Sequence, residues 1–64
     1  MNQNSIPDRL KAARGQRSTA EVAAAVGTSR SAIQMYECGL RVPKDSIKVK
    51  LANFYQTTVQ DLFF

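Results

Sequence analysis

Four side chains that can make hydrogen bonds or apolar contacts fall on one face of the segment 29–38, SRSAIQMYEC. When the segment is drawn as a helix at about 100° per residue, this face consists of Arg30, Ser31, Gln34 and Met35. The opposite face consists of Ala32, Ile33 and Tyr36, with Glu37 at its border. The first face contains no acidic residue, and we expect it to be exposed while the second is buried.

The chemistry of the first face suits the major groove of double-stranded DNA. Arginine can donate two hydrogen bonds to guanine, glutamine can pair with adenine through two bonds, and serine can bond either. A methionine outside the core can contact the methyl group of thymine, although a single exposed methionine needs no special explanation. We therefore take as candidate base contacts Arg30, Ser31, Gln34 and Met35.

A short turn, GTS at 27–29, joins this segment to a preceding alanine-rich one. A glycine-containing turn of three or four residues makes two helices cross steeply, as in a helix-turn-helix. An ordinary helical hairpin in a small bundle is the alternative that the turn alone leaves open. Ser29 is the predicted N-cap of the second helix of the pair.

Start and stop signals divide the chain into short helices, and no alternating segment is long enough to form a paired strand. Ser18 with Glu21, and Thr58 with Asp61, have the spacing of capping boxes. The expected helices are 7–14, 18–26, 29–38, 43–56 and 58–64. The predicted fold is therefore all-α, a single domain over residues 6–64 preceded by a flexible N-terminal arm of residues 1–5.

Apolar spacing predicts the core. Ile47, Leu51 and Tyr55 recur every four residues, which is the spacing of one buried helix face. Tyr36 and Tyr55 are assigned to the core rather than to a base-stacking surface. The full expected core is Val22, Ala23, Val26, Ile33, Tyr36, Ile47, Leu51, Tyr55, Val59 and Leu62.

Composition excludes several function classes. The 64 residues include no histidine and one cysteine, which rules out a disulfide framework and a zinc cluster of Cys and His ligands. The sequence has no glycine-rich phosphate loop and no serine or cysteine with an evident base, so we expect neither an enzyme nor a cofactor. It has no apolar run near the ~20 residues of a membrane span and no signal peptide, so we expect a cytoplasmic, nucleoid-associated protein that does not enter a membrane.

The charge favours a polyanionic partner. Nine Lys and Arg residues against five Asp and Glu residues give a net charge of +4, and the isoelectric point is near 9.7. A small basic domain of this kind favours nucleic acid over an anionic membrane. A surface that is merely soluble is the alternative.

With these features together, the chain resembles the phage repressor and Cro class of helix-turn-helix proteins, the Xre family. The matching text is STAEVAAAVGTSRSAIQMYECGLRVP, followed by IKVKLANFY and TTVQDLFF, and the likeness extends from Asp8 to Phe63. The resemblance implies a compact five-helix, lambda-repressor-like domain whose third helix binds the major groove. It also implies a sequence-specific transcriptional regulator of a phage or mobile element, with an antitoxin-like or other protein-interaction module as the alternative.

The resemblance assigns roles to individual positions. Base-reading positions fall on Arg30, Ser31 and Met35, with Gln34 beside them, and a partly buried ion pair falls on Arg14 and Glu37. Thr19 stands where the family often has a glutamine that holds phosphate, so its hydroxyl and the helix N-terminus must make this contact instead. Cys38 stands where the family often has an asparagine, so the polar contact of that asparagine is not implied here. The candidate phosphate contacts are Arg17, Ser18, Thr19, Ser29, Arg41 and Lys44.

The expected partner is a DNA operator, which we expect to be palindromic. One helix contacts only a few base pairs, so a second copy of the chain would double the contacts on the same duplex face. The sequence LFF at 62–64 offers Phe64 as a candidate seed for a weak homodimer on DNA. The alternative is that Phe63 and Phe64 both fold back onto their own core.

Overall fold

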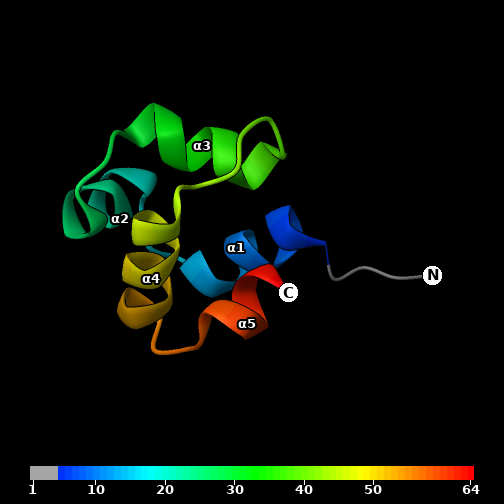
Figure 1. Cartoon of the computed structure of the whole chain (residues 1–64). Helices are drawn as coiled ribbons and strands as arrows, with labels where there is room; N and C mark the ends of the chain where they lie inside the picture. The colour runs from blue at the N-terminus through cyan, green and yellow to red at the C-terminus, as the bar shows by residue number, and fades with distance from the viewer. Residues whose placement is uncertain (1–4) are drawn as a thin grey trace.

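Four of the five helices in the described part of the chain begin after a hydroxyl side chain that accepts a hydrogen bond from a free N–H group of the first turn. The computed structural model describes residues 5–64. Its helices, shown in Figure 1, are α1 (Ile6–Arg14), α2 (Thr19–Val26), α3 (Arg30–Cys38), α4 (Asp45–Phe54) and α5 (Val59–Phe63). The described residues contain no strand, and the predicted all-α fold is confirmed.

The predicted hydroxyl caps are present. Each cap oxygen accepts a hydrogen bond from the backbone N–H three residues later, at 3.0 Å for Ser18, 3.1 Å for Ser29 and 3.0 Å for Thr58. Ser5 caps α1 in the same way at 3.3 Å, so this helix begins one residue before the expected position. Residues 1–4 of the expected flexible arm lie outside the described residues.

The expected bounds of α4, residues 43–56, were wrong at both ends. Lys44 is extended, with a ψ of 159°, and its side chain makes no capping hydrogen bond because an ammonium group cannot accept one. The helix therefore starts at Asp45, and Pro43 lies buried in the loop before it. At the other end Gln56 has a φ of 58°, a left-handed conformation that no helical residue adopts.

Replacing Gln56 by glycine is expected to stabilise the protein by up to about 1 kcal/mol, because a side chain in the left-handed conformation costs roughly 1–2 kcal/mol. Part of that gain is offset by the greater freedom of glycine in the unfolded chain. Urea unfolding of both proteins measures the difference. Gln60→Gly is the matched control, since Gln60 lies exposed inside α5 and its replacement should destabilise. A loss of stability in both variants would contradict the assignment of strain to Gln56.

The core lies between the helices, and α1 and α2 each contact two other helices around it. α1 contacts α3 and α5, and α2 contacts α3 and α4, so α3 and α5 lie on opposite sides of α1 (Figure 1). α4 also packs on α5. The buried apolar residues are Leu10, Val22, Ala23, Val26, Ala32, Ile33, Tyr36, Leu51, Ala52, Leu62 and Phe63.

Most of the expected core is confirmed, but its edge is different. Ile47, Tyr55 and Val59 are only partly buried and pack against the core from outside. The buried face of α4 is centred on Leu51 and Ala52, because α2 and α5 approach this helix from two sides. The core list omitted Leu10 because it took no residue from α1, which the structure places between α3 and α5.

The two aromatic residues at the end of α5 have different environments. Phe63 is buried, with 4% of its surface exposed, whereas Phe64 is 79% exposed. The alternative in which both residues fold onto the core therefore holds for Phe63 alone.

No helix among residues 5–64 is long and apolar enough to cross a membrane.

Candidate nucleic-acid interface

The turn between α2 and α3 sets the direction of α3. Gly27 is left-handed, with φ 76° and ψ 37°, and its N–H donates to the carbonyl of Ala23. The N–H of Thr28 donates to the same carbonyl at 2.9 Å, and Ser29 then caps α3. Glycine takes this left-handed conformation without steric cost. The chain thus changes direction within three residues, and α3 packs on both α2 and α1.

The buried face of α3 holds this helix against the core. Ala32, Ile33 and Tyr36 are buried as the helical pattern predicts, and Ile33 is among the largest fully buried side chains. On the other face Arg30, Ser31 and Gln34 are exposed.

Met35 differs from the other members of the predicted exposed face, because it is only partly exposed. At about 100° per residue, Met35 lies roughly 60° from the buried Ala32, at the edge of the exposed arc. The expectation that Met35 is exposed together with Arg30, Ser31 and Gln34 therefore holds only in part. Its accessible part still lies beside Ser31, four residues earlier on the same face.

Glu37 is the acidic residue of α3, and it is buried with only 5% of its surface exposed. Its carboxylate accepts two hydrogen bonds from the Arg14 guanidinium, 2.7 Å from Nε to Oε2 and 3.0 Å from Nη2 to Oε1. The predicted contact between these side chains is therefore present. This bidentate pair ties the end of α1 to the second half of α3, and it removes the carboxylate from the exposed face.

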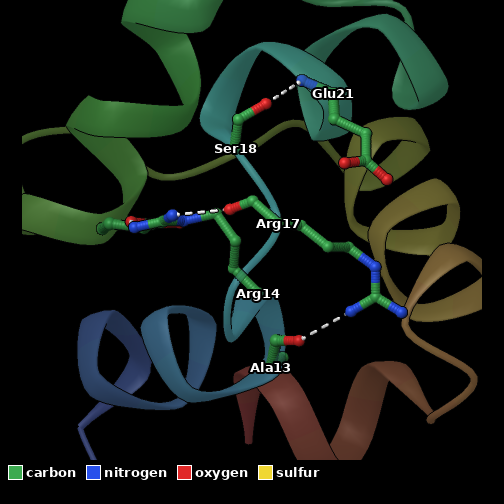
Figure 2. A network of polar contacts seen from close by, with 6 residues as sticks. Ala13, Arg14, Arg17, Ser18 and Glu21 are labelled. Carbon is green, nitrogen blue, oxygen red and sulfur yellow. Dashed lines mark hydrogen bonds and ion pairs between the residues drawn. The ribbon is translucent and has the colours of Figure 1, made fainter.

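The same guanidinium also closes the loop between α1 and α2. Arg14 Nη1 donates to the carbonyl of Arg17 at 2.8 Å, and Figure 2 shows this contact beside the Ser18 cap of α2.

The hydrogen bond with Glu37 raises the pKa of Arg14 above its usual value. Burial, with a further contribution from the Glu37 charge, raises the pKa of Tyr55 to about 12.

A hollow of about 360 Å³ lies between the α2–α3 turn, the loop after α3 and the start of α4. Three candidate phosphate contacts, Ser29, Arg41 and Lys44, line it together. Two further hydroxyl residues at its wall, Thr28 and Ser46, were missed by the sequence analysis. The sequence does contain a signal for both residues. Thr28 directly precedes the α3 cap, and Ser46 lies in the first turn of α4, where free N–H groups attract anions.

The remaining phosphate candidates lie at the start of α2. Ser18 caps the helix and Thr19 is its first residue, partly buried. Arg17 is exposed but folds away from α3, as Figure 2 shows. Its guanidinium donates to the carbonyl of Ala13 at 3.4 Å and lies 5.3 Å from the centre of the Phe54 ring. The structure therefore does not bring Arg17 to the hollow that Arg41 and Lys44 line.

A short turn between two packed helices, with an exposed polar face on the second, defines a helix-turn-helix. A family model described as "Helix-turn-helix domain" matches residues 8–62, and the chain belongs to this family of DNA-binding domains. Comparison with curated proteins and with solved structures returned no significant match.

Proposed function

We propose that the protein is a sequence-specific, double-stranded DNA-binding transcriptional regulator of the repressor or Cro type, with α3 in the major groove. The main support is the exposed face of α3. Arg30, Ser31 and Gln34 are accessible there, while Glu37 is buried against Arg14. An exposed face with hydrogen-bond donors and no carboxylate can approach base edges without repelling the phosphates.

The proposed contacts divide by type. Arg30, Ser31 and Gln34 bond base edges, and the accessible part of Met35 meets a thymine methyl. Arg41 and Lys44 bind phosphates beside the hollow, where Ser29 can donate its hydroxyl proton while its oxygen caps α3. The other phosphate contacts, at the start of α2, are Arg17, Ser18 and Thr19. For Arg17 this requires its guanidinium to leave Phe54 when DNA binds.

We further propose that residues 6–64 act as one domain and that residues 1–5 form an arm whose last residue, Ser5, caps α1. Two copies are proposed to form a weak dimer on a palindromic operator. The operator would then present two half-sites about one helical turn, roughly 34–36 Å, apart. A phage or mobile element is the proposed source, and the cytoplasm, at the nucleoid, the proposed place of action. No metal or cofactor is needed for this binding.

Binding to a random duplex at two salt concentrations tests the proposal. We expect affinity to fall steeply as salt rises, because cations around each bound phosphate are released. Selection of bound sequences from a random duplex pool should then recover a preferred site. A chain that binds no duplex at low salt would instead support a protein-interaction module, and affinity without any preferred sequence would contradict the regulator.

A further inference from the structure

The loop that follows α3 exposes two large aliphatic side chains to solvent. Leu40 is 79% exposed and Val42 is 71% exposed. Nothing in the proposed DNA contacts uses them, because aliphatic groups gain nothing beside phosphates. Leaving both in water gives up the free energy of burying them, about 1.5–3 kcal/mol for a fully buried side chain of this size.

A hollow of about 210 Å³ lies next to this loop. Its wall is mostly apolar and includes Ile6, Pro7, Tyr36, Val42 and Pro43. An apolar cavity of about 150 Å³ is large enough to bind benzene, so this hollow can accept one aliphatic side chain.

We propose that this hollow is the docking site for Leu40 of a second copy of the chain. A two-fold contact requires one surface that is complementary to itself. Here the projecting leucine and the apolar hollow belong to the same small patch, so each copy can supply both parts at once. Arg41 and Lys44 stand in the same loop, so the contact would lie beside the proposed phosphate contacts and next to the DNA.

The charges near the hollow favour the same occupant. Arg41 lines the hollow, and Asp8 follows Pro7, which also lines it. Both charged residues are exposed, and within residues 5–64 neither has an ion-pair partner. In a two-fold pair, the acid of one copy can face the base of the other on both sides of the axis.

The small size of the patch determines the strength of the contact. A stable interface buries about 800 Å² on each partner, far more than two aliphatic side chains and one hollow can offer. Two chains of charge +4 also repel each other. The contact is therefore weak in free solution and forms when neighbouring half-sites hold two copies close together on neutralising phosphates.

Phe64 is the competing surface, with an equal exposure of 79%. Phe64 lines neither this hollow nor the two hollows beside the α2–α3 turn and between α2 and α4. The Lys48 Nζ lies 5.8 Å from the centre of its ring, which places a charged group against the aromatic face. The apolar hollow therefore lies beside Leu40 and not beside Phe64.

The test compares Leu40→Gln with the unchanged protein on duplexes that contain one or two selected half-sites. The measurements on duplexes rest on the proposed function. Glutamine is uncharged, so single half-site affinity should stay within about twofold. The cooperative gain on two half-sites, roughly tenfold or more if a weak contact forms, should disappear. Val49→Gln is the matched control, because Val49 is 49% exposed on α4, outside the patch, and cooperativity should survive.

Sedimentation equilibrium without DNA, at high protein concentration, separates failure of this proposal from failure of the proposed function. Self-association of the unchanged protein that Leu40→Gln abolishes would support the contact even if no duplex bound. Loss of cooperativity or self-association in Phe64→Gln, with both retained in Leu40→Gln, would overturn it in favour of Phe64. Retention of both properties in all three variants would overturn it, as would the absence of both from the unchanged protein.

Discussion

Arg14→Met is expected to lower the free energy of unfolding by about 3 kcal/mol, because it leaves the Glu37 carboxylate buried without its partner. The Glu37 side chain is 7% exposed and the Arg14 side chain 25% exposed, so the expected cost is at the lower end for a buried pair. A domain of this length has a total stability of about 3–10 kcal/mol. Urea or thermal unfolding should therefore show a large loss of stability. The end of α1 should also no longer be held to α3 by this ion pair.

A second variant keeps this prediction testable if Arg14→Met does not fold. Arg14→Met combined with Glu37→Leu removes both charges and should recover most of the stability, since an apolar pair of similar volume often replaces a buried ion pair. Asp45→Asn is the control for an exposed pair, because the Asp45 side chain is fully exposed and lies 3.8 Å from Lys48. Its cost should stay within about 1 kcal/mol. An equally small cost for Arg14→Met would show that the Glu37 carboxylate reaches water.

Arg30→Ala is expected to weaken binding at the preferred site by about 1–3 kcal/mol and to relax the base preference at one position. Arg30 is the first residue of α3 and is exposed, so its removal leaves the core packing unchanged. Binding isotherms on the preferred duplex and on single-base variants measure both effects. Unfolding curves that coincide with those of the unchanged protein would confirm that the fold is intact.

Lys44→Ala is the matched control for this prediction. Lys44 lines the hollow with Arg41, where the proposed partner is a phosphate. Its loss should weaken binding to all duplexes about equally and reduce the salt slope by roughly one. If Arg30→Ala also weakens binding to all duplexes about equally, Arg30 binds phosphate and does not contact a base as proposed.

Local signals predicted most of the fold. Ser18, Ser29 and Thr58 were recognised as caps because a cap is decided within three residues. The end of α4 was not predictable in the same way, since nothing in the local pattern marks Gln56 as left-handed. The contact between Arg14 and Glu37 followed from the family resemblance, not from spacing, because 23 residues separate the two partners.

The candidate site was predictable on α3 and less so around it. A helical wheel separates Arg30 from Ile33 without knowledge of the tertiary structure, but it cannot decide Met35, which lies at the boundary of the two faces. The orientation of Arg17 depends on Phe54, a residue of another helix. Thr28 and Ser46 come together only when the loop after α3 returns past the α2–α3 turn.

The most direct test of major-groove contact by α3 is a double-mutant cycle between Arg30 and the guanine it is proposed to bind. Replacing that guanine by 7-deazaguanine removes only the N7 acceptor in the major groove. The account predicts that this change weakens binding of the unchanged protein and has little further effect on Arg30→Ala, because the two changes remove the same contact. Equal losses in both proteins, at every guanine of the site, would contradict it.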